Sequence, residues 1–193
     1  MKKLYILSFA LVAIVFISCT NSTKNPLTGD STENKAYKEL KFGMTAEKVK
    51  EMGYTKMDKP EKMDDQGFEM YSSEIKDMAG VNFDNNILYF SENQLVQVRL
   101  IKISQKKEEA LEVWDTIYNS TKAKYGTPTE KALLNTRKVN WVIGNKIITC
   151  TIKKEISFIS NDLYINSVNI MDQKLMDEIE NSKIKKYKEN TDI

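Results

Sequence analysis

Apolar and polar residues follow three different spacings along this chain. Residues 4–17 form an apolar run without a charge, residues 95–103 alternate between apolar and polar, and residues 105–126 repeat apolar positions at helical spacing. These spacings predict a signal-type segment, a β-strand and an amphipathic helix, in that order. With the shorter patterns described next, the predicted order is helix, strands, helix, strands, helix.

The first predicted helix covers about residues 45–52, and chemical signals mark both of its ends. Thr45 can accept a backbone N–H as the N-cap, and Glu47 places an anion in the first turn, where the helix dipole favours it. Met44 and Val49 have the spacing of a hydrophobic staple. Gly53 can end the helix in a left-handed backbone conformation.

Alternating residues predict the strands that follow this helix. We expect a strand in residues 68–75, a hairpin or bulged pair of residues 80–83 and 87–90 around a turn at 84–86, and a central strand at 95–103. In the central strand, Leu95, Gln97, Arg99, Ile101 and Ile103 should share one face, and Val96, Val98, Leu100 and Lys102 the other.

The second half of the chain repeats this sequence of patterns. Ser104 is predicted to cap a helix over residues 105–126, and Gly126 to end it. The helix should cover a sheet with a stripe of Ala110, Trp114, Ile117, Tyr118, Thr121 and Tyr125. Strands are expected at residues 132–143, 146–153, 155–160 and 163–170. A last helix should begin at Asp172 and carry Leu175, Met176 and Ile179.

This order of elements predicts an α+β fold, in which antiparallel meander sheets have helices packed across one face. The prediction divides the chain into a signal peptide (1–18), a lipidated flexible tether (19–35), a first α+β half (36–103) and a second α+β half with the C-terminal helix (104–193). The two halves are expected to be related to each other.

The apolar run at the start of the chain ends at a cysteine. Lys2 and Lys3 precede the run, and Ser18 and Cys19 follow it. Its length of about fourteen residues is short for a membrane span, which needs about 20. The ending resembles the bacterial lipobox, with Phe16 where Leu is usual. That resemblance implies a lipoprotein that is cleaved before Cys19, acylated there with chains such as palmitate, and anchored on the extracytoplasmic side of the cell envelope. The alternative is a plain anchor helix with an incidental cysteine.

Charge and composition narrow the possible functions. Removal of Lys2 and Lys3 with residues 1–18 lowers the basic count from 29 to 27, which equals the 27 acidic residues. A neutral mature chain argues against nucleic acid as a partner, because that binding needs a basic surplus. The chain has no histidine, which excludes Ser-His-Asp triads, Cys-His dyads and His-based zinc sites. We therefore predict no catalytic residue, no cofactor and no metal site.

The remaining candidate groups are better explained by structural roles. Cys150 lies between β-branched neighbours and is predicted to be a strand side chain rather than a nucleophile. The acidic pair Asp64 and Asp65 and the run at residues 84–86 lack the alternating spacing that wraps a calcium ion. Both runs are typical of turns.

One motif resembles a known family. Residues Gly43, Met44, Thr45, Glu47, Val49 and Gly53 match the Gly-Met-Thr element and short helix that open SmpA/OmlA-type envelope lipoproteins and the repeat of the β-lactamase inhibitory protein. Tyr54 stands where that family usually has Pro, and the second half is similar only at residues 124–128 and the strands after them. The resemblance implies a non-enzymatic envelope lipoprotein that offers a sheet or helix edge to partner proteins.

We expect a non-catalytic protein-binding or scaffolding module that Cys19 holds at the membrane, with an envelope protein as its partner. Tyr89, Trp141 and Tyr164 are the candidate contact residues. One alternative is a carrier of a small apolar ligand, which would need an apolar pocket under residues 105–125. A carboxylate-dependent hydrolase is the other alternative, and it would need two carboxylates that face each other about 5 to 9 Å apart.

Overall fold

The computed structural model describes residues 34–58, 68–74, 76–133, 136–155 and 162–191. Its helices are α1 (Ala46–Glu51), α2 (Lys107–Tyr125) and α3 (Gln173–Thr191). Its strands are β1 (Lys35–Tyr37), β2 (Leu40–Lys41), β3 (Thr55–Lys56), β4 (Glu69–Ser72), β5 (Asp77–Met78), β6 (Val81–Asn82), β7 (Asn85–Ser91), β8 (Gln94–Ser104), β9 (Thr129–Leu133), β10 (Thr136–Ile143), β11 (Lys146–Glu155) and β12 (Leu163–Asp172). The predicted signal peptide, Cys19 and the tether up to residue 33 lie outside the described residues.

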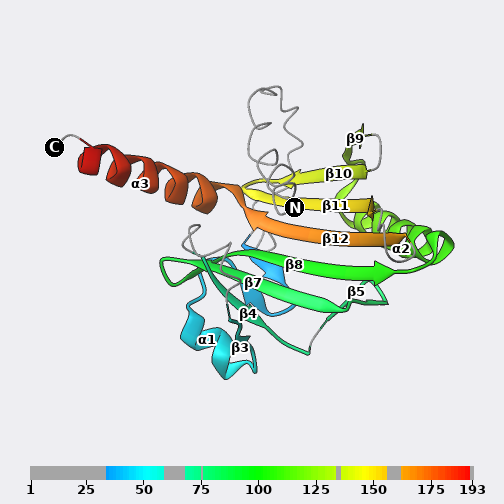
Figure 1. Cartoon of the computed structure of the whole chain (residues 1–193), viewed down its shortest axis with the longest axis horizontal. Coiled ribbons are helices and arrows are strands. Elements are labelled where there is room, and N and C mark those ends of the chain that lie inside the picture. Colours follow the sequence, from blue (N-terminus) through cyan, green and yellow to red (C-terminus); the bar gives the residue numbers. More distant parts are fainter. Residues whose placement is uncertain (1–33, 59–67, 75, 134–135, 156–161, 192–193) are drawn as a thin grey trace, which may run out of the picture. The chain divides into compact units, whose positions relative to one another are not determined.

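One antiparallel sheet organises the part of the chain that the structure describes. Its eight strands run in the order β3-β4-β7-β8-β12-β11-β10-β9 (Figure 1). Two small two-stranded sheets, β1 with β2 and β5 with β6, accompany it. The predicted α+β fold with antiparallel meanders is confirmed.

The large sheet contains two meanders that meet at their last strands. In the first, α1 is followed by β3, β4, β7 and β8, and in the second, α2 is followed by β9, β10, β11 and β12. The strands β8 and β12 pair antiparallel from Gln97 opposite Met171 to Ser104 opposite Tyr164. Strands of residues 36–103 and of residues 104–193 therefore share one continuous sheet.

One face of this sheet, called here the core face, carries the main hydrophobic core. Side chains of Leu88, Val98, Val168, Ile148 and Trp141 come from successive strands of the sheet and belong to one buried cluster. The helix α2 contacts β8, β11 and β12, and its predicted stripe supplies Ala110, Trp114, Ile117 and Thr121 as buried residues. Burial of this stripe against the sheet confirms the amphipathic reading of residues 105–126.

A bulge in β8 changes which residues face the core. Tyr89 pairs with Gln97, but Phe90 pairs with Leu95, so Val96 is an extra residue in β8. Leu95 consequently joins the main core, whereas Val96 belongs to a second cluster with Tyr89. The prediction that Leu95 shares a face with Gln97 was wrong, because an extra residue shifts the two-residue alternation by one position.

The capping prediction is confirmed for α1 and was wrong for the start of α2. Thr45 is the N-cap of α1 and accepts the backbone N–H of Lys48 at 3.4 Å, and Gly53 follows the helix with φ of +87°, so both predictions are confirmed. The prediction for Ser104 was wrong. β8 continues through Ser104, which pairs with Tyr164, and α2 begins only at Lys107 without a side-chain cap.

The strand pairing around residues 80–90 also differs from the prediction. β6 pairs back with β5 and not with β7, whose partners are β4 and β8. The carboxylate of Asp84 accepts the backbone N–H of Ile103 at 2.7 Å, which ties the start of β7 to β8. Glu155 is the last residue of β11, and the rest of the strand predicted at residues 155–160 lies outside the described residues.

The opposite face of the sheet is covered at one end by α3. Ile179 of α3 is buried with Met70, Tyr89 and Val96, and Leu175 and Met176 pack against this second cluster, as the sequence predicted. Asp172 accepts the backbone N–H of Leu175 at 3.1 Å at the start of the helix. Among the described helices, none is long and apolar enough to cross a membrane.

Candidate functional site

Uncharged polar side chains gather on the sheet face opposite the core, across β8, β12, β11 and β10. Arg99, Asn169, Thr149 and Asn140 stand opposite one another in the strand register, which puts their side chains in one row on one face. We define the polar face by the side chains of Gln97, Arg99, Asn140, Thr149, Thr151, Ser167 and Asn169.

Hydrogen bonds between neighbouring strands hold these side chains in place. The Gln97 amide donates to Asn169 Oδ1 at 3.2 Å, and the Thr149 hydroxyl donates to Asn140 Oδ1 at 2.8 Å. The hydroxyl oxygens of Thr151 and Ser167 lie 2.6 Å apart in a further hydrogen bond. These contacts fix the rotamers. Thr149 and Ser167 are buried, and the other five side chains of the polar face are half-buried and present their groups to solvent.

Within the row of Arg99, Asn169, Thr149 and Asn140, Arg99 is the one charged side chain, and Lys138 stands opposite Thr151 on the same face. Apolar residues such as Ile101, Ile147 and Met171 stand between the polar side chains. Arginine is enriched in protein–protein interfaces. The Nε atom of Arg99 is shielded from solvent and has no hydrogen-bond acceptor among the described residues.

The three aromatic residues that the sequence suggested for partner contact do not form one surface. Tyr89 is 7% exposed and meets the ring of Phe68 edge-on at 6.4 Å in the cluster under α3. Trp141 is 3% exposed on the core face, where its indole N–H donates to the carbonyl oxygen of Gly126 at 2.8 Å. Tyr164 is half-buried against the same main core. The structure therefore separates Tyr89 from the other two by the thickness of the sheet.

Sequence reasoning missed the polar face, although its signal is present in the chain. In each of the four strands two polar residues lie two positions apart, and these pairs are Gln97 and Arg99, Lys138 and Asn140, Thr149 and Thr151, and Ser167 and Asn169. Each stretch looks like an ordinary strand with one solvated side. The shared row appears only once the strand register is known.

The cysteine and the acidic residues that the sequence analysis considered as reactive or metal-binding groups have structural roles where the structure describes them. Cys150 is 1% exposed in β11, which confirms the predicted strand side chain, and burial raises the pKa of its thiol to about 12. Asp84 binds a backbone N–H and Lys102, at 3.2 Å, while Asp64 and Asp65 lie outside the described residues. Within the residues that the structure describes, no three His, Cys, Asp or Glu side chains cluster to hold a metal ion.

A comparison with protein families gives one match, which spans more than half of the chain. Residues 37–150 match a family model whose description reads "Uncharacterised protein". The chain belongs to this family. The matched range begins in β1 and ends in β11, so it includes α1, α2 and most of the large sheet. No curated protein and no solved structure matches the chain.

Proposed function

We propose that this protein is a non-catalytic, lipid-anchored module of the cell envelope that docks a partner protein on the polar face of its sheet. The observation that carries the proposal is the row of Arg99, Asn169, Thr149 and Asn140, which crosses four strands. Interstrand hydrogen bonds hold its amide and hydroxyl groups in place beside an arginine, and arginine is enriched in protein–protein interfaces.

The chemistry of the row fits an interface rich in hydrogen bonds. Amide and hydroxyl side chains can pair with a partner directly or through ordered water, and neither mode requires burial of an ion. Arg99 would supply the strongest single contact, because its half-buried guanidinium can donate to carbonyl or carboxylate oxygens. Loss of a donor at such a position removes binding energy that flanking neutral contacts do not replace.

The anchor supports the same role. Acylation of Cys19 would give two or three chains, which hold a protein stably at a membrane where a single chain does not. The polar composition of residues 20–33 predicts a tether with a reach of roughly 20 Å, which would let the module meet an envelope protein without lying on the lipid. The resemblance of residues 43–53 to envelope lipoproteins supports the same proposal.

Site-specific cross-linking in the living cell tests the docking face. A photoreactive residue in place of Val142, which is 69% exposed beside Asn140, should give a cross-link to one discrete envelope protein. The same residue in place of the exposed Asp115 on α2 should not give that product. Equal yields of the product from both positions would contradict the proposal.

A charge variant makes the test specific to the row. Asn140→Asp keeps the oxygen that accepts from Thr149 but adds a carboxylate to the polar face. A buried unpaired charge should lower the cross-link yield about tenfold or more. The matched control is Asn119→Asp on the exposed side of α2, which should leave the yield unchanged. Thermal melts of both variants establish that they fold, and an unchanged yield in a folded Asn140→Asp variant would refute docking at this face.

Carriage of a small apolar ligand is the second candidate function, and one specific observation favours it. A pocket of about 300 Å³ opens between β1, the β5–β6 hairpin and the end of α2, on the side of the core face. Its lining holds a single carboxylate, Asp77, and so does not supply the carboxylate pair that glycoside hydrolysis requires. Incubation of the protein with a lipid extract, followed by mass spectrometry of co-purified small molecules, tests this function.

A further inference from the structure

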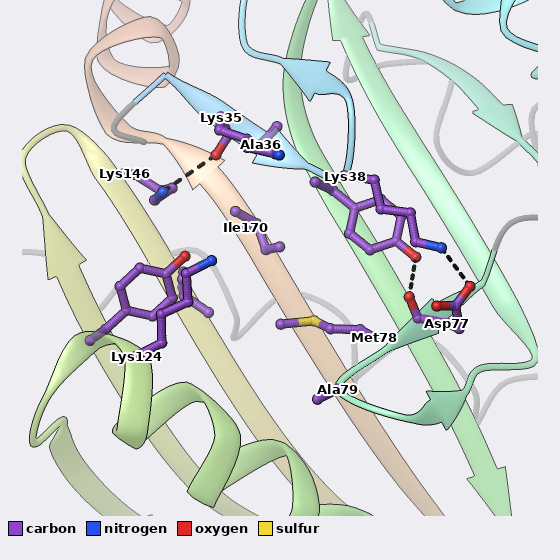
Figure 2. Close-up of a pocket in the computed structure, with 12 residues that line it drawn as sticks. Lys35, Ala36, Lys38, Asp77, Met78, Ala79, Lys124, Lys146 and Ile170 are labelled. Atoms are coloured by element: carbon purple, nitrogen blue, oxygen red, sulfur yellow. Dashed lines mark hydrogen bonds and ion pairs between the residues drawn. The ribbon is translucent and has the colours of Figure 1, made fainter. Parts of the chain in front are cut away.

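The pocket beside the C-terminal end of α2 combines an apolar floor with a cationic edge. In Figure 2, Lys124 and Lys146 lie on one side of the pocket, Lys38 and Asp77 lie on the other, and Ile170 and Met78 lie between them. The charged side chains therefore lie at the two sides of the pocket, and the apolar side chains lie between them.

Buried strand residues make the floor. Ile148 and Ile170 face the pocket from β11 and β12 and are 2% and 3% exposed, and Met78 reaches it from the β5–β6 hairpin. These side chains offer no hydrogen-bonding group. A hydrocarbon chain placed against them would lose contact with water and gain about 0.8 kcal/mol per buried methylene in transfer free energy.

The far wall is fixed by hydrogen bonds between β1 and the β5–β6 hairpin. Tyr37 donates its hydroxyl to the carbonyl oxygen of Asp77 at 2.7 Å, and Lys38 donates to the Asp77 carboxylate at 2.5 Å. Burial raises the pKa of Tyr37 well above its usual range, and the Asp77 carboxylate acts in the same direction, so the tyrosine stays a neutral donor. The single carboxylate of the pocket is thereby paired within its own wall.

The cationic edge lies where α2 ends over β11. Lys124 and Lys146 approach the ring of Tyr125, with their ammonium nitrogens 5.1 and 5.4 Å from its centroid. Lys146 is 2% exposed and also donates to the carbonyl oxygen of Lys35 at 3.4 Å. Lys35 and Lys124 are exposed lysines of the lining, and their positive charge favours an anion at the edge.

We infer that this pocket binds a small single-chain amphipathic anion, with its carboxylate or phosphate head at Lys124 and its alkyl chain over Ile170 and Met78. This inference rests on the second candidate function, ligand carriage, and names the ligand class. The volume has room for about ten water-sized groups, which suits a single chain of medium length. A neutral hydrocarbon would contact only the apolar floor of the pocket, and a short anion would contact only its cationic edge.

Calorimetric titration of the full chain in nanodiscs of zwitterionic lipid tests the inference, with empty nanodiscs as the blank. Octanoate should bind, octanol should bind about tenfold more weakly because it lacks the charge-assisted contacts, and acetate should give no measurable heat. Each methylene removed from the chain should weaken binding about fourfold while the chain contacts the floor.

A pair of lysine variants separates the site from general surface charge. Lys124→Gln should weaken octanoate binding about fivefold and leave octanol unchanged. Lys122→Gln is the matched control, because Lys122 sits in the same helical turn and lies 5.5 Å over the ring of Tyr118, but it does not line the pocket. The Lys122→Gln variant should bind octanoate as tightly as the unaltered protein does.

The outcomes distinguish the inference from the function on which it rests. If octanol binds as tightly as octanoate and Lys124→Gln changes neither, ligand carriage stands and the anionic class is overturned. If neither ligand binds to the protein above the blank, both are overturned. Equal losses in the Lys124 and Lys122 variants would show that binding follows surface charge, and this result would also refute the pocket as the site.

Discussion

Replacement of Trp141 separates a core role from a partner-binding role for this residue. Trp141 is 3% exposed in β10, its ring lies 6.0 Å from that of Tyr118, and its indole N–H donates to the Gly126 carbonyl oxygen at 2.8 Å. The side chain thereby joins the sheet to the end of α2. We predict that Trp141→Ala lowers the free energy of unfolding strongly, because it leaves a large cavity and removes this link.

The size of the effect follows from the burial and the hydrogen bond. Truncation of a buried tryptophan to alanine costs about 3–5 kcal/mol. Trp141→Phe retains most of the aromatic packing and loses the hydrogen bond and part of the ring, so about 2 kcal/mol is expected. A surface residue that served only a partner would change stability by less than about 0.5 kcal/mol. The core role and the partner-binding role therefore predict losses of stability that differ by at least about 2.5 kcal/mol.

Equilibrium unfolding in urea, followed by far-ultraviolet circular dichroism, measures this difference. The expected loss for Trp141→Ala corresponds to a lower Tm by about 6–20 °C in a chain of this size. Val142→Ala is the control, because the adjacent side chain is 69% exposed and should have little effect. A stability change of 0.5 kcal/mol or less in Trp141→Ala would refute the assignment of this residue to the core.

Three further predictions concern the anchor, the hairpin contact and the free thiol. Cys19→Ala should give an uncleaved precursor that takes up no labelled palmitate, and retained acyl label would contradict the lipobox interpretation. The hydrogen bond from Lys38 lowers the pKa of Asp77, so this contact is complete above the ordinary carboxyl pKa of 3.8 and is lost as the pH falls through the lowered value. A carboxyl NMR titration should therefore place the Asp77 midpoint below 3.8, and Lys38→Gln should raise it; an unshifted midpoint in that variant would disprove the contact. Burial raises the pKa of Cys150 to about 12, so a thiol reagent at pH 8 should label it in the acylated protein only after unfolding, and equal rates before and after would show that it is accessible.

Local signals in the chain were sufficient for most helices and strands. Thr45 and Gly53 bracket α1 because an N-cap hydroxyl and a left-handed glycine act within one helical turn. The stripe from Ala110 to Thr121 was readable because its spacing repeats regardless of what covers it. Ser104 failed as a cap because its pairing with Tyr164, sixty positions along the chain, extends β8 past the expected end.

The candidate sites needed information that a linear sequence does not hold. Alternation showed that Arg99 and Asn169 each project from a strand, but not that β8 and β12 are neighbours. The bulge at Val96 exchanged the faces of two apolar residues without any change in composition. The pocket likewise joins Lys35 of β1, Asp77 of the hairpin, Lys124 of α2 and Ile170 of β12, which come from four separate parts of the chain.

The sequence by itself determined the periodicity of α1, α2 and the long strands, because this depends on residues within a few positions of one another. The tertiary structure alone decided that the last strands of the two meanders pair, and this pairing sets Gln97 against Asn169 to form the polar face. The tertiary structure also decided that β1, the β5–β6 hairpin and the end of α2 leave a pocket lined by lysines on the side of the core face. Both outcomes depend on burying apolar surfaces from distant segments together, and that free energy is a property of the whole packed arrangement rather than of any one stretch.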